Sequence, residues 1–231
     1  MRIAMMGSGG IGGYFGGRMA ATGADVTFIA RGRHLDAIRH NGLRIDSAEL
    51  GDAVIHPAQA TDTPADVGLV DCVILGVKLW DTEETGRAIA PMLRPDTIVL
   101  SLQNGVDGDD ILEPIVGRER LIGGVAFIAS SISKPGTIKH VGSMQRIVLG
   151  EPDGSSSGRV SALYDAMTAG RIDAEISDDI ERTIWEKFVF LVGMSSTTTL
   201  MNSEIGPIRT DPEGREFLLS VFREVTAVGR A

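Results

Sequence analysis

The sequence predicts an α/β fold in which a doubly wound parallel sheet is followed by a helical region. Three observations support this fold class. A glycine cluster, G-x-G-x-x-G, stands between an apolar strand-like run and a helix-compatible segment. Apolar runs typical of buried parallel strands then alternate with helical segments up to residue 116. From residue 178 onward the pattern is helical only, so we expect one domain over residues 1–177 and the start of an incomplete helical domain over residues 178–231.

Composition restricts the function classes. The 231 residues are 43% hydrophobic and 23% charged, as is ordinary for a globular protein. The net charge of −9 argues against a nucleic-acid partner, because that binding depends on basic groups. No apolar stretch approaches the roughly 20 residues of a membrane span, and no signal peptide is evident, so we expect a cytoplasmic protein without a membrane partner. Cys72 is expected to be buried, and the four scattered histidines predict no metal site.

The first strand is expected at residues 3–6, directly before the glycine cluster. Gly7 would permit a tight turn, Gly9 would let the backbone approach a pyrophosphate, and Gly12 would let the following helix pack closely on the strand. The N–H groups at the start of that helix would face the anion. The predicted dinucleotide-binding residues are therefore Gly7, Ser8, Gly9, Gly10, Ile11 and Gly12.

Arg31 stands at the end of the next expected strand, residues 25–30. NAD-preferring folds often place an acid there to hold the ribose 2′-hydroxyl, whereas this chain has Arg31-Gly32-Arg33. A guanidinium can hold a 2′-phosphate through paired hydrogen bonds, so the sequence predicts NADP(H) over NAD(H). An exposed basic turn before a helix is the alternative interpretation.

The remaining elements are expected in chain order. A short helix spans 34–40, a hairpin of short strands spans 43–45 and 53–56, and 61–66 is a loop. Buried parallel strands at 71–77 and 97–102 alternate with helices at 81–93 and 109–116. Strand-like runs at 121–132, 136–141 and 145–149 have no helix between them and predict an antiparallel extension of the sheet. A helix at 159–169, a short strand at 174–176, a long helix at 178–202 that ends before Gly206-Pro207, and a last helix from 211 complete the chain.

Lys78 and Asn104 each follow a predicted parallel strand directly. In an open α/β sheet, ligands lie beyond the carboxyl ends of the strands. The lysine could hold cofactor phosphates or a substrate carboxylate, and the asparagine amide could hold the nicotinamide or a substrate carbonyl. For each of them, a polar residue that merely ends a strand is the alternative.

Lys187 lies in a helical segment, residues 184–192, that is apolar nearly all round and is therefore expected to be buried. Burial lowers the pKa of an ammonium, which suits a general acid that protonates the oxygen when a ketone is reduced. A lysine that keeps its charged end in water is the alternative. Ser195 and Ser196, two turns further on, could donate to a carboxylate or to carbonyls of their own helix.

As an ordered set, these residues resemble the ketopantoate reductase (2-dehydropantoate 2-reductase) family over essentially the whole chain. The motifs that carry the resemblance are the glycine turn, Arg31, Lys78, Gln103-Asn104-Gly105, His140–Glu151 and Trp185-x-Lys187. The resemblance implies a Rossmann-type N-terminal domain and a helical, 6-phosphogluconate dehydrogenase-like C-terminal domain. It also implies reduction of a small 2-oxo acid, 2-dehydropantoate, to pantoate with NADPH, in pantothenate biosynthesis.

The resemblance also implies roles for individual residues. Lys187 would be the catalytic proton donor, and Arg31 and Lys78 would bind NADPH. Asn104 would bind cofactor and substrate at the cleft between the domains. Ala129 would contribute backbone next to the nicotinamide.

Two positions depart from the family pattern. The family follows its lysine with substrate-binding asparagines four and eight residues on, whereas this chain has Leu191 and Ser195. Ser195 is the remaining candidate for substrate binding on this helix. A site with Leu191 should favour a different, more apolar 2-oxo acid. The chain also ends at residue 231, inside what should be the C-terminal domain.

Two other functions stay open at this stage. One is a non-catalytic NADP(H)-binding protein, such as a redox sensor. The other is a different NADP-dependent two-domain dehydrogenase, such as one that acts on 3-hydroxy acids. A homodimer is compatible with each of these functions.

Overall fold

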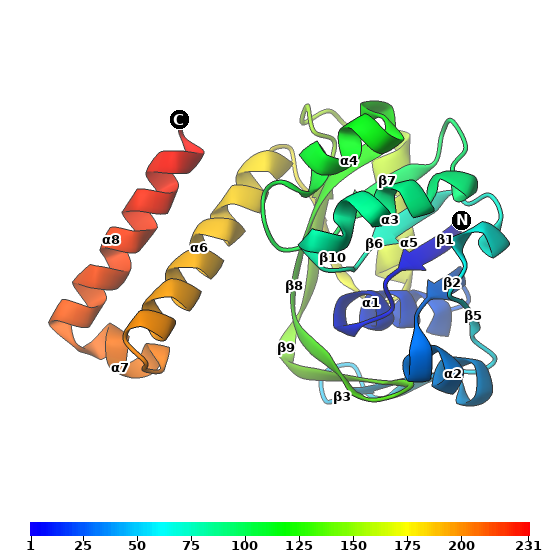
Figure 1. Cartoon of the computed structure of the whole chain (residues 1–231), viewed down its shortest axis with the longest axis horizontal. Coiled ribbons are helices and arrows are strands. Elements are labelled where there is room, and N and C mark those ends of the chain that lie inside the picture. The colour runs from blue at the N-terminus through cyan, green and yellow to red at the C-terminus, as the bar shows by residue number, and fades with distance from the viewer. The chain divides into compact units, whose positions relative to one another are not determined.

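The computed structural model describes all residues, 1–231, and divides the chain into two units, Met1–Ile180 and Glu181–Ala231. The expected boundary between residues 177 and 178 lies three residues before this division. The two units are described separately below (Figure 1). No helix in either unit has the length and apolarity that a membrane crossing requires.

The first unit is built on a ten-stranded sheet with the order β4-β3-β9-β8-β7-β6-β1-β2-β5, and β10 pairs with β9. The strands are β1 (Arg2–Met6), β2 (Asp25–Ile29), β3 (Leu43–Ser47), β4 (Ala53–Ile55), β5 (Gln59–Thr61), β6 (Cys72–Leu75), β7 (Ile98–Ser101), β8 (Leu121–Lys134), β9 (Thr137–Gly150) and β10 (Asp173–Ile176). From β5 to β8 every neighbouring pair is parallel. The chain moves outward from β1 in one direction through β2 and in the other through β6, so the sheet has its switch point between β1 and β6.

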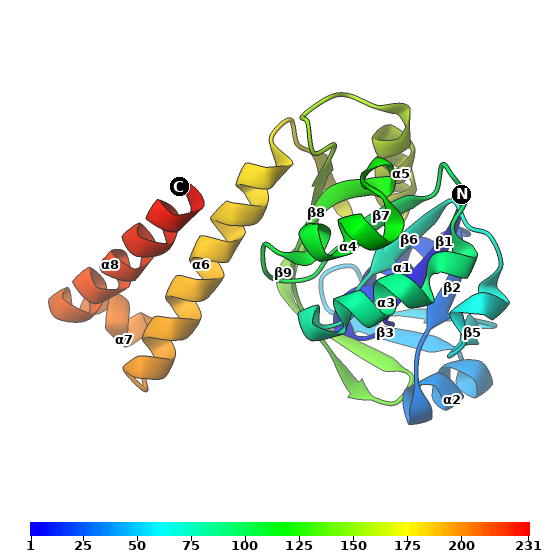
Figure 2. The same cartoon turned by 45° about the horizontal axis from the view of Figure 1, so that its top comes forward.

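Side chains that alternate along the central strands form two cores. Ile3 and Met5 of β1 pack with α1 (Gly10–Ala21) and α5 (Gly158–Ala169). Ala4 and Met6 pack with α3 (Thr82–Ala88) and α4 (Gly108–Val116) on the opposite face (Figure 2). A strand buried on both faces in this way confirms the expected α/β layering. Cys72 of β6 is buried in the first of these cores, as expected.

The antiparallel extension is confirmed, and it bends the sheet around α1 (Figure 1). Strands β8 and β9 form a long ribbon, and β9 also pairs with β3, which forms the expected hairpin with β4. The glycines of α1 make this enclosure possible. A Cβ on Gly13 would lie 2.8 Å from Ile138 of β9, and one on Gly17 would lie 2.7 Å from Ile45 of β3.

The runs expected as separate strands at 136–141 and 145–149 are a single strand, β9, interrupted by a bulge. Its pairing with β8 shifts between Ile128 and Ala129, which leaves residues 142–144 outside the ladder. His140 closes the bulge, because one ring nitrogen lies 2.8 Å from the Met144 carbonyl oxygen and the other lies 2.9 Å from Ser47 Oγ on β3.

Three further expectations were wrong in detail. The expected loop at 61–66 begins with the end of β5, a short edge strand. The helix expected at 81–93 is three pieces, η2 (Leu79–Asp81), α3 and η3 (Ala90–Met92). The last break falls just before Pro91, which cannot donate a helical hydrogen bond. Gly206-Pro207, expected to break the long helix, lies instead inside the first turn of a new helix that begins after the long helix has ended, where a proline loses no helical bond.

The second unit is helical, as expected. It comprises most of α6 (Ile180–Leu200), α7 (Ile205–Thr210) and α8 (Pro212–Gly229). Glycines let α6 and α8 approach closely. Gly193 lies under the ring of Phe222, and a Cβ on Gly229 would lie 2.7 Å from Trp185. In the first unit, α2 (Gly32–Asn41) follows β2, and two short 3-10 helices, η1 (Pro64–Val67) and η4 (Arg118–Arg120), precede β6 and β8.

Candidate functional site

The glycine turn joins β1 to α1 at the switch point of the sheet, and Gly7 and Gly12 are both required by their surroundings. Gly7 has a φ of +93°, which side chains disfavour. A Cβ on Gly12 would lie less than 3.0 Å from the Gly7 carbonyl oxygen. The roles predicted for Gly7, a tight turn, and for Gly12, close packing, therefore agree with this local geometry.

The outer side of the turn is open. A Cβ on Gly9 would have nothing within 4 Å, whereas the other side of the turn is packed against Gly76 and Val77, after β6. Gly9 precedes the first residue of α1, and the first helical bond runs from the Gly13 amide to the Gly9 carbonyl at 2.7 Å. The amides of Gly10, Ile11 and Gly12 thus have no helical acceptor and stand at the positive end of the helix dipole. This cradle fits the pyrophosphate of a dinucleotide.

Strand β8 passes beside the same turn. A Cβ on Gly10 would lie less than 3.0 Å from the Ser130 carbonyl oxygen, so this glycine is needed for contact with β8. Ala129, the adjacent residue, is exposed and lies at the register shift opposite the β9 bulge. The structure therefore brings the backbone around Ala129 next to the start of α1.

Arg31 lies at the carboxyl end of β2 and is the N-cap residue of α2. Its side chain is exposed and has no ion-pair or hydrogen-bond partner in the chain, and the same is true of Arg33. Most other arginines of the first unit pair with a carboxylate, as Arg44 does with Asp52. An unpaired guanidinium at the end of the second strand fits the 2′-phosphate of NADP(H).

The loops that carry Lys78 and Asn104 are joined by Gln103. The Gln103 amide nitrogen donates to the Lys78 carbonyl at 3.1 Å and lies 2.8 Å from Thr82 Oγ1, while its oxygen accepts from Ser101 Oγ at 2.9 Å. These bonds hold the carboxyl ends of β6 and β7 together. Lys78 and Asn104 are therefore exposed on adjacent loops at one edge of the sheet.

Asp109, near this edge, has an unusual pKa that the sequence did not predict. It lies in the first turn of α4, five residues after Asn104. Burial, with a smaller contribution from the neighbouring Asp110 charge, raises the pKa of Asp109 to about 6. The signal was present in the sequence as two adjacent acids, but acids in a first helical turn are common, and burial cannot be read from them.

Lys187, Leu191 and Ser195 follow one another at four-residue intervals along α6 and so share a helix face. Burial lowers the pKa of Lys187 to about 8, as expected for a desolvated ammonium. The Ser195 hydroxyl donates to the Leu191 carbonyl at 2.7 Å, which is the second of its two predicted alternatives. The expectation that this helix is buried all round is wrong at Phe190, which is 54% exposed.

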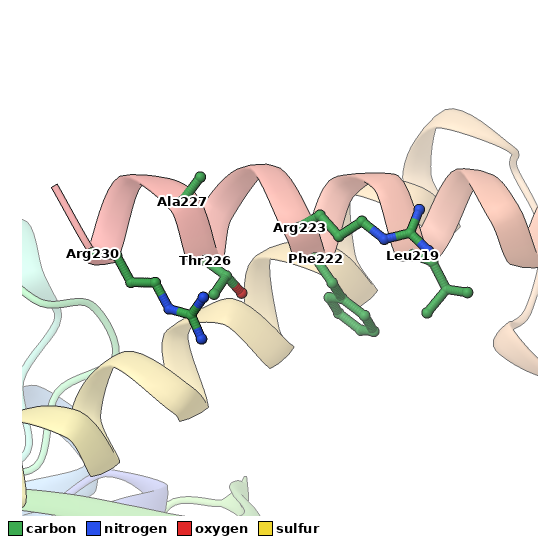
Figure 3. Close-up of a pocket in the computed structure, with 6 residues that line it drawn as sticks. All are labelled: Leu219, Phe222, Arg223, Thr226, Ala227 and Arg230. Atoms are coloured by element: carbon green, nitrogen blue, oxygen red, sulfur yellow. The ribbon is translucent and has the colours of Figure 1, made fainter.

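A groove along α8 contains none of the predicted site residues. It is lined by Leu219, Phe222, Arg223, Thr226, Ala227 and Arg230, which all belong to that helix (Figure 3). It offers no carboxylate, histidine or glycine turn, and we assign no chemistry to it.

The curled parallel sheet, its glycine turn and the helical second unit place the chain in the class of Rossmann-type α/β proteins with a helical C-terminal region. Two family models match it: "Ketopantoate reductase PanE/ApbA" over residues 3–154 and "Ketopantoate reductase PanE/ApbA C terminal" over residues 179–231. The chain belongs to the ketopantoate reductase family.

Relatives and solved structures agree with this assignment. A 2-dehydropantoate 2-reductase of Mesorhizobium japonicum is 31% identical over 252 residues, covering 100% of this chain and 76% of the relative. An uncharacterized oxidoreductase of Bacillus subtilis is 30% identical, covering 100% and 75%. The crystal structure of 2-dehydropantoate 2-reductase from Porphyromonas gingivalis superposes with a TM-score of 0.93 at 32% identity, covering 100% and 82%. This chain is an enzyme of that type, an oxidoreductase that acts on CH–OH groups.

Proposed function

We propose that this enzyme reduces a small 2-oxo acid to the 2-hydroxy acid with NADPH, and that 2-dehydropantoate is the substrate. The observation that carries the proposal is the open glycine turn with unpaired Arg31 at the end of the next strand. The turn suits a pyrophosphate, and the guanidinium suits the extra phosphate that distinguishes NADPH from NADH. The relatives named 2-dehydropantoate 2-reductase support the substrate.

Within this proposal, the bound coenzyme supplies hydride to the keto carbon, and the chain supplies the remaining chemistry. The amides at the start of α1 bind the pyrophosphate. Arg31 and Lys78 bind phosphate groups, and the exposed Asn104 donates from its amide to coenzyme and substrate. Lys187 donates the proton that the substrate oxygen needs, because its lowered pKa eases proton release while keeping it mostly charged near neutral pH.

The coenzyme preference is tested by calorimetric titration of the chain with NADPH and with NADH. We expect NADPH to bind more tightly, and Arg31→Ala to lower NADPH affinity about 10- to 100-fold, because a charge-assisted bond is lost. NADH affinity should change little in that variant. Arg33→Ala is the matched control, since Arg33 is equally exposed and unpaired two residues away. Equal affinity of the unchanged chain for both coenzymes would exclude the NADPH preference.

A second candidate is a reductase for a more apolar 2-oxo acid, and Leu191 favours it. This side chain shares the helix face of Lys187 and cannot hydrogen-bond a hydroxyl or carboxylate. A steady-state assay with NADPH should compare 2-dehydropantoate with branched aliphatic and aryl 2-oxo acids. An aryl acid is a useful member because D-mandelate dehydrogenase, solved with NADH and anilino(oxo)acetate, has the same fold at 24% identity and a TM-score of 0.84. NADPH binding without its oxidation by any of these acids would favour a non-catalytic binding protein.

A further inference from the structure

His34 joins three segments of the proposed coenzyme site that are separate in the sequence. It lies on α2, three residues after Arg31. One ring nitrogen, Nε2, lies 2.9 Å from the Ser8 carbonyl oxygen in the glycine turn. The other, Nδ1, lies 3.0 Å from the Gly136 amide nitrogen in the turn between β8 and β9. The side chain is half-buried between these elements.

The two partners determine the protonation state of the ring. A backbone amide can only donate, so Nδ1 accepts from Gly136 and carries no proton. A carbonyl oxygen can only accept, so Nε2 carries the proton and donates it to Ser8. A doubly protonated ring would set two N–H groups against each other at Gly136. Burial also lowers the pKa of His34 from its usual value, against a smaller opposing effect of the bond to Ser8.

Every polar group of Ser8 is hydrogen-bonded within the chain. Its amide donates to the Ile29 carbonyl at 3.0 Å, and its hydroxyl donates to the same oxygen at 3.0 Å. His34 takes the remaining group, the Ser8 carbonyl. A carbonyl oxygen released from this bond could turn toward the phosphates. The negative charge of the phosphates would then repel the negative partial charge of that oxygen. The imidazole thus keeps the Ser8 carbonyl away from the amides that would face the anion.

We infer that His34 is a positioning residue for the coenzyme, which holds the glycine turn, the Arg31 segment and the β8–β9 turn in the geometry that binds NADPH. The inference rests on the proposed function. His34 itself need not touch the coenzyme. Its effect reaches the pyrophosphate through Ser8 and the 2′-phosphate through the start of α2.

The test uses paired substitutions at this position and calorimetry. His34→Gln keeps an acceptor for Gly136 and a donor for Ser8, whereas His34→Leu keeps neither. We expect His34→Leu to weaken binding of NADPH, and of the fragment 2′-phospho-ADP-ribose that lacks nicotinamide, about tenfold. His34→Gln should stay within about threefold of the unchanged chain. The matched control is His40→Leu on the same helix, since His40 is exposed and bonds only to the Asp36 carbonyl one turn earlier.

Unchanged affinity in folded His34→Leu would overturn the inference while leaving the proposed function intact. Failure of the unchanged chain to bind NADPH would instead overturn the proposed function. If His34→Leu does not fold, His34→Asn replaces it, because that shorter amide cannot bridge both partners and should bind NADPH more weakly than His34→Gln. Nitrogen NMR of the unchanged chain with labelled histidine is an independent check. A neutral ring protonated at Nε2 is expected for His34, and protonation at Nδ1 would exclude the two-bond bridge.

Discussion

In the glycine turn of the first unit, close backbone packing and a network of hydrogen bonds fix each group in place. On α6 of the second unit, by contrast, three separate side chains define the face. Gly12 has no room for a Cβ, and Ser8 is bonded at its amide, hydroxyl and carbonyl. Lys187, Leu191 and Ser195 are interior residues of a regular helix, where the backbone can accept other side chains at a modest cost in stability. The proposed coenzyme site is therefore tied to the fold itself, whereas the α6 positions proposed to face the substrate can change with the fold kept.

The largest effect is expected from Lys187→Ala. Removal of a general acid should lower turnover about 10²- to 10⁴-fold, because the substrate oxygen would have no positioned proton donor. NADPH affinity, measured by calorimetry, should stay within about twofold, since the proposed coenzyme site lies on the first unit. Glu186→Ala is the control, because the adjacent Glu186 is exposed and pairs only with Arg182 on the surface. Unchanged turnover in Lys187→Ala would remove the proposed role.

Two glycine substitutions should separate stability from binding within the turn. Gly12→Ala forces a Cβ against the Gly7 carbonyl oxygen and should lower the free energy of unfolding by about 2–3 kcal/mol. Gly9→Ala places its methyl in open space and should change that free energy by less than about 0.5 kcal/mol. The same methyl would occupy the side proposed for the pyrophosphate and should weaken NADPH binding at least about tenfold. Chemical denaturation and calorimetry measure the two effects, and full NADPH affinity in Gly9→Ala would place the pyrophosphate elsewhere.

These regions also differ in how far the sequence predicted them. The glycine turn, the strand before it and the helix after it were predicted correctly, because glycine spacing and apolar runs are local signals. The alternation along β6, α3, β7 and α4 was predicted for the same reason, although Pro91 divides the expected helix. Strand β5 was not predicted, because its three residues, Gln-Ala-Thr at the edge of the sheet, show no apolar pattern.

The contacts that connect the site could not be predicted, because each joins residues far apart in the chain. His34 meets Gly136 across 102 positions, and Gln103 meets Lys78 across 25. The sequence shows a histidine and a glutamine at these positions, but the partners depend on how the sheet curls. The β9 bulge could not be predicted either, because the sequence pattern indicates two separate strands there. The contact of His140 with the Met144 carbonyl, which closes the bulge, appears only in the structure. The roles of Lys78, Asn104 and Ala129 toward a ligand remain predictions.

The rate of reduction should depend on pH through Lys187. The donor is effective while protonated, and burial lowers its pKa to about 8. The value of kcat/KM for the 2-oxo acid should therefore be level below that pH and fall up to about tenfold per pH unit above it. Lys187→Arg stays charged across this range, so any activity that it retains should not fall near pH 8. A level profile to pH 10 in the unchanged enzyme would exclude Lys187 as the titrating donor.

The smallest effect is expected from Leu191→Asn, which tests whether the α6 face can change substrate choice while the fold is kept. An amide at this position could bond a substrate hydroxyl or carboxylate, as the family's asparagine would. The ratio of kcat/KM for 2-dehydropantoate to that for a branched aliphatic 2-oxo acid should rise about tenfold, because one bond to substrate is gained and apolar contact is lost. Asparagine is a poorer helix former than leucine, so the free energy of unfolding should fall by about 0.5 kcal/mol, with a further loss from reduced packing.

Ser195→Asn, which changes the next position on the same face, separates two explanations of that result. The Ser195 hydroxyl is already bonded to the Leu191 carbonyl. An asparagine at this position would extend a polar group further from the helix without removing an apolar contact. If polarity next to Lys187 sets substrate choice, Leu191→Asn should shift the ratio more than Ser195→Asn, and the double variant should shift it most. If neither variant shifts the ratio, the α6 face does not determine specificity, and the loops that carry Lys78 and Asn104 become the next positions to test. Substitution of each loop residue, Lys78→Ala and Asn104→Ala, with the same ratio measured, would show whether the sheet edge sets substrate choice.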